Sequence, residues 1–395
     1  MKVSQMDHSG KTVFVGIDVH KKNYAIAAVA DHLPSQIKFG NLRACPTALV
    51  EKLRVTFPGA ILKTVYEAGF AGYNLHRTLV ANGIGNIVVN PASIEIAVNN
   101  RVKTDKRDAV KMAVHLSRDM LRGIRIPAEQ EELERLYSRT REQLVGDRAR
   151  TGVRIKAKLF QFALIAPDDD RVMSDKLLSD FLNLQMPPEL ADVVATLANI
   201  YRDLSREIKV LEGKMCKLAE KHSDIEDLYR SVPGVGPITS RVFTAELGDM
   251  KQFKSEKQLF SFLGLTPSEY SSGESERKGR ITKQGSSTLR SMLVEVAWRA
   301  IAQDETLRVS YDCLKATRGG KRAIVAIARR LSGKMRACQL RKSTYVMKAS
   351  RRHAKLGTGK DHSRTGASTV EASTPCAAHR GVGAAPYVEV NLAPV

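Results

Sequence analysis

Residues 11–18 read KTVFVGID, and this stretch decides the fold of the first third of the chain. Its β-branched and apolar residues predict a strand that ends on an acid, Asp18. A polar turn follows at residues 19–23, and residues 24–30 (YAIAAVA) predict a second strand that forms a hairpin with the first. A short third strand is expected within residues 36–41.

Helices and strands alternate beyond this hairpin. Residues 46–57 and 73–81 have helical apolar spacing, whereas residues 61–66 (ILKTVY) and 85–90 (GNIVVN) predict strands. This order predicts an α/β domain with a mixed sheet. Glu67 directly follows one of these strands, as Asp18 ends another. Both acids are therefore expected at carboxyl strand ends, where open α/β sheets place their sites.

Two further acids lie in residues 103–109, KTDKRDA. Asp105 and Asp108 stand three apart at the head of a predicted helix, about 60° apart around its axis, so they share one face. Taken alone, this stretch also fits a solvated face of charged side chains. Four carboxylates in one crevice would repel one another unless cations neutralised them. Mg²⁺ prefers hard oxygen ligands, and two such ions can stabilise both oxygens of an in-line phosphoryl displacement.

The composition favours a polyanionic partner. The 395 residues include 63 Lys and Arg against 42 Asp and Glu, a net charge of +21. An anionic membrane surface is the alternative, but the chain has no long apolar run, and residues 1–11 lack the apolar core of a signal peptide. The five cysteines are far apart and form no ligand cluster. They indicate reduced, mostly structural thiols in a cytosolic protein and argue against zinc.

Residues 128–225 predict a helical arm, with breaks at Pro167 and at Pro187 and Pro188. Two apolar stripes with helical spacing run through it. The first comprises Leu133, Leu136, Tyr137 and Leu144, and the second Leu197, Tyr201, Leu204, Ile208 and Leu211. Two long helices joined by a loop predict an antiparallel coiled coil with a structural role.

A mostly helical unit is expected to follow. The turn PGVGP at residues 233–237 fits a helix-hairpin-helix, whose Gly234 and Gly236 would let backbone N–H groups approach a phosphate. A plain joint between helices fits equally well. Residues 321–340 predict a packed basic helix, and residues 313–360 contain 15 Lys and Arg but no Asp or Glu. From about residue 348 the pattern fades into a tail that we expect to be disordered, with a basic start that contacts phosphates non-specifically.

A Ser- and Gly-containing loop with several cations follows residue 266. A serine in such a loop can act as a phosphoryl-transfer nucleophile, because the cations stabilise the alkoxide and the pentavalent phosphorus. Composition alone favours a plain polar loop. The residues therefore leave both interpretations open.

Four stretches resemble the catalytic domain of the DEDD transposases of insertion-sequence family 110, the Piv/MooV type: GIDVHKKNYAIA, VYEAGFAGYNLHRTL, NPASI and RVKTDKRDAVKMA. GLTPSEYSSGESERKGRITKQGSSTLR resembles the second characteristic region of that family. The resemblance extends from residue 11 to about residue 345. It implies an RNase H/RuvC-like fold in which Asp18, Glu67, Asp105 and Asp108 are catalytic and bind Mg²⁺.

The resemblance also implies a catalytic serine in the second region. The family pattern pairs the serine with a following glycine or small residue, which selects Ser272, with Ser271 as the alternative. The stretch Glu274-Ser275-Glu276 stands where relatives usually carry Gly or Lys, which leaves the roles of the neighbouring cations open. The expected nucleic-acid contacts are Lys103, Lys106, Arg107, Gly234, Gly236, Arg277, Lys278, Arg280 and Lys283.

Four parts are therefore expected: a RuvC-like catalytic domain over residues 1–127, the arm over 128–225, a small, mostly α serine-bearing domain over 226–347, and the tail over 348–395. The expected activity is that of a transposase or site-specific recombinase. Ser272 would attack a DNA phosphate and form a covalent protein–DNA intermediate. Two alternatives remain: a RuvC-like Holliday-junction nuclease that uses metal and water only, and a non-enzymatic nucleic-acid binder.

The family resemblance further implies the partners. They are double-stranded DNA, at the element ends and at the target, and a non-coding bridge RNA that pairs with both. Dimers would assemble into tetramers on synapsis, with no membrane partner. The expected location is the bacterial cytoplasm, in association with the nucleoid.

Overall fold

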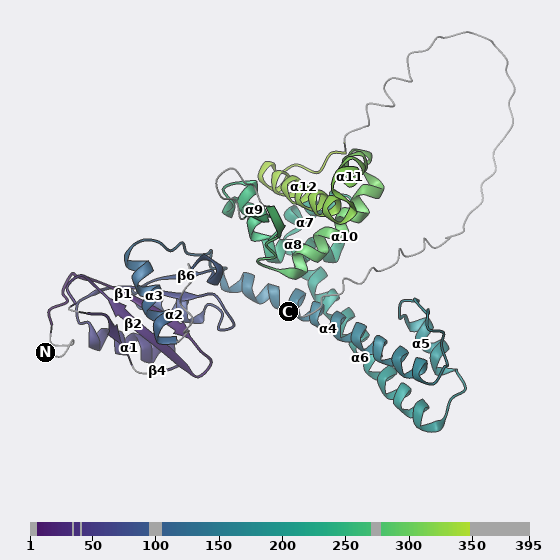
Figure 1. The fold of residues 1–395 in the computed structure, drawn as a ribbon, viewed down its shortest axis with the longest axis horizontal. Coiled ribbons are helices and arrows are strands. Elements are labelled where there is room, and N and C mark those ends of the chain that lie inside the picture. The colour runs from purple at the N-terminus through teal and green to yellow at the C-terminus, as the bar shows by residue number, and fades with distance from the viewer. Residues whose placement is uncertain (1–5, 34, 40–41, 95–104, 270–277, 348–395) are drawn as a thin grey trace, which may run out of the picture. The chain divides into compact units, whose positions relative to one another are not determined.

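The computed structural model describes residues 6–33, 35–39, 42–94, 105–269 and 278–347, with backbone only at Ser93, Lys106 and Lys278. The expected tail, the loop with both candidate serines, and Lys103 lie outside these residues. The N-terminal part is a mixed sheet (Figure 1) with strand order β3-β2-β1-β5-β6. The strands are β1 (Thr12–Val19), β2 (Asn23–Val29), β3 (Ile37–Lys38), β4 (Leu42–Arg43), β5 (Ile61–Glu67) and β6 (Gly85–Val89).

Strand pairing confirms the predicted hairpin and the predicted mixed sheet. β1 pairs antiparallel with β2 and parallel with β5, which in turn pairs parallel with β6. β3 and β4 are short antiparallel additions to β2. In this register Ile17 lies beside both Ile26 and Tyr66. The carboxyl ends of β1 and β5 therefore lie next to each other.

Helices cover both faces of the sheet. On one face, alternate β1 residues such as Val15 and Ile17 share a core with Leu49 and Leu79, which belong to α1 (Pro46–Thr56) and α2 (Asn74–Ala81). The other face lies against α3 (Asp105–Ser117). A second, smaller cluster joins Met112 of α3 to Val65 of β5 on that side. This layered arrangement confirms the predicted α/β class for the N-terminal part.

Two long helices follow, α4 (Glu129–Gln161) and α6 (Pro188–Lys221), with the short α5 (Asp175–Leu182) between them. α4 and α6 pack side by side in opposite directions, since Arg141 pairs with Glu212 at 2.7 Å while Ile155 and Leu159 share a core with Leu190. Tyr201 and Ile208 are buried, as the second predicted stripe requires.

The first predicted stripe is partly wrong. Leu133 and Leu136 are 51% and 55% exposed, whereas Thr151 and Gly152 are buried in α4. A Cβ added at Gly152 would lie 3.1 Å from the Met173 side chain. Small residues lie at this contact because they allow close approach of the packed segments, so apolar spacing alone does not locate the buried positions of α4.

The remaining described residues form a mostly helical unit around one large core that includes Phe243, Leu293 and Ile327. The predicted basic helix is α12 (Gly320–Arg341). The other elements are α7 (Ser223–Arg230), α8 (Pro237–Leu247), η3 (Met250–Gln252), α9 (Glu256–Phe262), β7 (Pro267–Glu269), β8 (Lys278–Ile281), α10 (Ser287–Gln303) and α11 (Glu305–Arg318).

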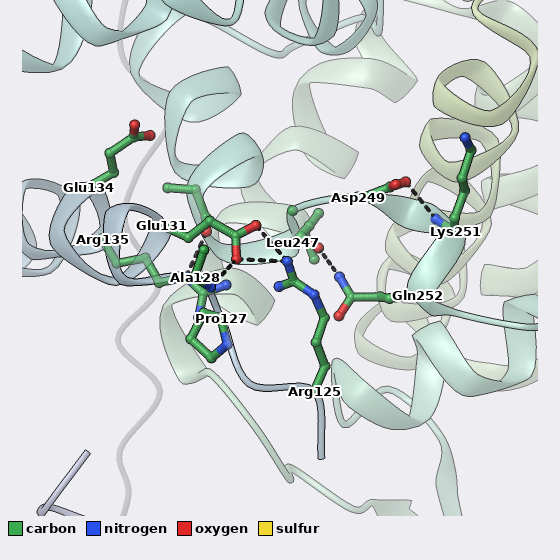
Figure 2. A network of polar contacts seen from close by, with 12 residues as sticks. Arg125, Pro127, Ala128, Glu131, Glu134, Arg135, Leu247, Asp249, Lys251 and Gln252 are labelled. Carbon is green, nitrogen blue, oxygen red and sulfur yellow. Dashed lines mark hydrogen bonds and ion pairs between the residues drawn. The ribbon is translucent and has the colours of Figure 1, made fainter. Parts of the chain in front are cut away.

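Polar contacts fix the start of α4. Glu131 accepts the Ala128 N–H at 2.9 Å, and Arg125 donates to both of its carboxylate oxygens at 2.6 and 2.7 Å (Figure 2). Burial opposes ionisation of Glu131, but these donors outweigh it and hold its pKa below the ordinary value. One helical turn later, Arg135 donates to the Ala245 carbonyl at 2.7 Å. These bonds connect the chain before α4 to α4 itself, and α4 to the end of α8.

A buried ionic group lies deeper in the same region. Arg241 is 3% exposed and contacts Glu226 and Glu134 at 3.1 Å each, while Ser240 donates to Glu226 at 2.7 Å. Charges this far from water are tolerated because each has a partner. The group ties α4, α7 and α8 together.

The cysteines and the helix composition agree with part of the sequence analysis. The four cysteines in the described ranges are free, but only Cys338 is buried, and Cys216 and Cys313 are exposed. A structural role for most of them is therefore wrong. None of the helices in the described part of the chain has the length and apolar run needed to cross a membrane.

Candidate metal centre

Asp18 lies near the end of β1 and contacts a histidine that the sequence analysis did not select. The Nε2 atom of His20 is 3.3 Å from Oδ2 of Asp18 and 3.2 Å from Oδ2 of Asp105. Asp18 is 25% exposed, and the two other side chains are open to solvent. Ligand atoms of these three residues all lie within 4.8 Å of one another. Two of the four predicted acids thus meet in space.

Close contact between α3 and β1 brings them together. Gly16 and Asp18 lie two residues apart, on the same face of β1. A Cβ at Gly16 would lie 2.0 Å from the carbonyl oxygen of Ala109 and 2.7 Å from the backbone nitrogen of Ala113. Both alanines are fully buried. Three small residues therefore let the helix lie directly on the strand, and its first turn reaches the Asp18 end of β1.

Replacing Gly16 by alanine tests this packing. We expect the free energy of unfolding to fall by about 2–3 kcal/mol, because the added methyl group meets backbone atoms that cannot rotate away. The matched control is Gly213→Ala in the exposed middle of α6, where nothing lies within 4 Å. That change should instead stabilise the protein by up to about 1 kcal/mol. Equal stability of the Gly16→Ala variant and the wild type in chemical denaturation would contradict the described contact.

The other two acids lie nearby. Glu67 is the last residue of β5, one step beyond the pair Ile17–Tyr66 of the parallel register. Alternation places it on the same face as Val65, which is the face that α3 covers. Asp108, one turn into α3, is close enough for its charge to raise the pKa of Asp18. Neither belongs to the tight group of Asp18, His20 and Asp105.

The electrostatics of the site favour a bound cation. Burial raises the pKa of the Asp18 carboxyl above its ordinary value, and the charges of Asp105 and Asp108 raise it further. The contact with His20 lowers the pKa of Asp18 and so acts in the opposite direction. Asp105 and Asp108 lie in the first turn of α3, where the helix dipole favours negative charge. Burial and the neighbouring negative charges destabilise the ionised Asp18 carboxylate, so a cation beside it would stabilise it strongly.

The donor set fits a divalent metal ion. Carboxylate oxygens are the preferred ligands of Mg²⁺, and imidazole nitrogen is a common ligand of transition metals. Ligand atoms at right angles around a metal, each about 2.1 Å away, are about 3 Å apart. The two contacts of His20 Nε2 have this spacing. Asp18 and Asp105, with His20 between them, could therefore hold such an ion without rearrangement of the backbone.

His20 could not be selected from the sequence, because the direction of a side chain in a turn depends on the conformation of that turn. A weak signal was present, since His20 follows Asp18 by two residues, and such residues share a face where the extended strand continues. The structure shows that the hairpin keeps this geometry. The His20 N–H donates to the Asn23 carbonyl at 3.0 Å, next to the paired residues Val19 and Tyr24.

The expected nucleic-acid contacts in the described ranges are only partly accessible. Arg107 is exposed on the first turn of α3, and Arg280 and Lys283 are exposed at and just beyond β8. Gly234 has a φ of +85°, and a Cβ there would lie 2.7 Å from the Arg299 Cβ. Its lack of a side chain thus serves packing against α10. Gly236 has nothing within 4 Å of its Cβ position. Arg277, like Lys103, lies outside the described residues.

Both candidate serines lie in the sequence between β7 and β8, which pair antiparallel. Arg290 of α10 holds the base of this strand pair. Its Nη1 atom donates to the carbonyls of Gln284, Gly285 and Leu263 at 2.5, 3.2 and 3.3 Å. Both Ser271 and Ser272 lie outside the described residues. The structure thus describes the two strands that flank the candidate serines in the sequence.

An α/β domain with acids at the ends of two adjacent strands and a strong positive charge is typical of metal-dependent enzymes that act on nucleic acids. Comparison with known proteins then gives the family. Residues 15–163 match the profile of the IS110-type DEDD transposases. Residues 226–312 match the profile described as "Transposase IS116/IS110/IS902 family". Together with the relatives below, these matches show that the chain belongs to the IS110 family of transposases, enzymes that cleave and join DNA.

Named transposases are similar over most of the chain. The transposase y4qE of Sinorhizobium fredii is 30% identical over 73% of this chain and 72% of its own length. The transposase for insertion sequence element IS1111A of Coxiella burnetii is 28% identical, over 71% and 78%. The transposase for insertion sequence element IS1533 of Leptospira borgpetersenii is 26% identical, over 82% and 94%.

Proposed function

We propose that this chain excises and inserts a mobile DNA element, with Asp18, Glu67, Asp105 and Asp108 as ligands of divalent ions, most simply Mg²⁺. The observation that carries the proposal is the meeting of Asp18 with Asp105 where α3 lies on Gly16. When bound, the metal supplies positive charge to the phosphate oxygens at which strand cleavage takes place. The role of the four acids would be to hold the metal ion at the position where its charge is needed.

The architecture that we propose extends the observed fold. The mixed sheet with α3 on one face supports an RNase H/RuvC-like domain over residues 1–127. α4 and α6 support a coiled-coil arm over residues 128–225, and the helical unit corresponds to a serine-bearing domain over residues 226–347. The acids and the serine would then belong to separate domains of one catalytic system.

Strand cleavage would proceed by transfer of a DNA phosphate to Ser272. The Ser272 oxygen forms a bond to the scissile phosphorus, the bond from phosphorus to the leaving sugar oxygen breaks, and that oxygen takes up a proton. The resulting phosphodiester joins protein and DNA. A sugar hydroxyl of another strand can then attack the same phosphorus and release the serine, so strands are exchanged without net hydrolysis.

The remaining partners follow from family membership together with the charge of +21. We propose double-stranded DNA at the element ends and target, a bridge RNA that pairs with both, and dimers that synapse into tetramers. Arg107, Arg280 and Lys283 are exposed cations on, or next to, the elements that carry the proposed acids and flank the proposed serine.

Metal removal tests the proposed metal centre. Purified full-length protein would be incubated with labelled insertion-end DNA, RNA from the region beside its gene, and Mg²⁺. Chelation with EDTA should abolish strand cleavage, and added Mg²⁺ should restore it. Retention of the DNA in a mobility-shift assay should persist throughout, because binding depends on the basic surface. Cleavage that continues in EDTA would rule out the metal-dependent reaction.

A further inference from the structure

We infer that His20 is a direct ligand of the metal ion held by Asp18 and Asp105, and that its nitrogen shifts the preference of this site from Mg²⁺ towards Mn²⁺. The inference rests on the proposed metal centre and adds to it a ligand and a metal preference. It starts from the three-residue group of Asp18, His20 and Asp105, the one group of potential ligands in the described ranges whose donor atoms lie this close together.

One nitrogen atom makes both contacts. His20 Nε2 lies 3.3 Å from the Asp18 oxygen and 3.2 Å from the Asp105 oxygen. A single N–H bond can point at one acceptor, so hydrogen bonding alone cannot use both contacts well. The two Nε2 separations are those of neighbouring ligands around one octahedral ion, which are about 3 Å apart, and all three donor atoms lie within 4.8 Å of one another. With the proton on Nδ1, the Nε2 lone pair can coordinate the ion that both oxygens bind.

The fold holds the imidazole in this place. Asp18 and Val19 pair with Ala25 and Tyr24 in the hairpin, and the His20 N–H donates to Asn23 at 3.0 Å. This hydrogen bond fixes the His20 backbone at the start of the turn, two residues after Asp18. A ligand whose backbone is fixed before the metal arrives loses little conformational freedom on binding.

The chemistry of nitrogen sets the expected preference. Mg²⁺ binds hard oxygen ligands and seldom uses imidazole, whereas transition metals accept imidazole readily. At a site made only of carboxylates, Mn²⁺ would have no specific advantage in affinity over Mg²⁺ from the ligand type. Adding one imidazole should strengthen Mn²⁺ binding selectively, and removing it should weaken Mn²⁺ binding about tenfold while changing Mg²⁺ binding much less.

Pulsed electron paramagnetic resonance on full-length protein with Mn²⁺ alone tests the inference without any DNA reaction. A directly bonded imidazole nitrogen modulates the electron spin echo of Mn²⁺. We expect this nitrogen modulation in the wild type, its loss in His20→Gln, and its retention in His32→Gln, a control histidine elsewhere in the same domain. Isothermal titration of the same proteins should show the selective, roughly tenfold loss of Mn²⁺ affinity.

The outcomes separate this inference from the proposed function. Mn²⁺ binding that is lost in Asp18→Asn but shows no nitrogen modulation in the wild type would overturn the role of His20 and leave the metal centre intact. Modulation that survives in His20→Gln would overturn it equally. Mn²⁺ affinity that does not change in Asp18→Asn would remove the metal centre itself. Should His20→Gln fold poorly, His20→Asn gives the same comparison.

Discussion

Asp18→Asn is expected to lower DNA strand cleavage by more than about 100-fold, because loss of even an outer partner of a metal ligand commonly costs 10–100-fold. The substitution preserves size and removes the charge that binds the ion. DNA affinity should change little, since it depends on the basic surface. Cleavage of labelled insertion-end DNA and a mobility-shift titration measure the two effects on the same preparation.

The stability of this variant gives an internal control. Burial and the charges of Asp105 and Asp108 raise the pKa of Asp18, so its ionised form is disfavoured in the folded protein. A neutral amide removes that repulsion, and the melting temperature should stay the same or rise. Asp31→Asn, an exposed acid of the same domain, should leave cleavage unchanged. An active Asp18→Asn enzyme would show that the acid cluster does not carry the reaction.

Ser272→Ala is expected to abolish the covalent protein–DNA adduct. The alanine lacks the oxygen that would bond to phosphorus, whereas metal binding at the acids is untouched. The assay is a denaturing gel of protein incubated with Mg²⁺, RNA and labelled insertion-end DNA, on which protein-linked DNA migrates as a separate band.

Ser271→Ala is the matched control, because it removes the neighbouring hydroxyl and should keep the adduct. Loss of the band in Ser271→Ala alone would reassign the nucleophile. Free nicked DNA without any adduct, unchanged by both serine substitutions but lost in Asp18→Asn, would favour a metal-dependent nuclease that uses water. The recombinase mechanism would then be withdrawn.

The strands and the acid positions could be predicted because they depend on local pattern. The apolar run ending in Asp18 and the run ending before Glu67 each specify a buried strand, and their shared polarity puts both acids at one edge. Asp105 and Asp108 share a face through helix periodicity alone. The hairpin and the α/β alternation predicted a mixed sheet, whereas the parallel pairing of β1 with β5 is known from the structure.

Other features depend on contacts that no local pattern specifies. In the sequence, Gly16 is simply a small residue within a predicted strand. In the structure, Ala109 and Ala113 of α3 lie directly against it. The burial of Gly152 and the exposure of Leu133 likewise reflect which side of α4 meets its neighbours. His20 falls in a polar turn, where composition gives no direction for the side chain. Each was decided by packing between segments distant in the sequence.

The two glycines at residues 234 and 236 belong to one motif but have different surroundings. The turn was compatible with a phosphate contact or with a plain joint. Gly234 faces Arg299 and the Val296 carbonyl of α10, whereas the Cβ position of Gly236 is open. Of these two glycines, only Gly236 has open space at its Cβ position, so a ligand could approach the backbone there. Sequence cannot make this distinction because it depends on where α10 lies.

Anomalous diffraction from crystals of the full-length protein soaked in Mn²⁺ tests the central claim most directly. The expected result is a peak between the carboxylates of Asp18 and Asp105, within about 2.3 Å of their oxygens, with the His20 nitrogen and Glu67 facing the same ion or a second one beside it. Clear peaks elsewhere in the protein, with the edge of the sheet at Asp18 empty, would contradict a metal centre built from these acids.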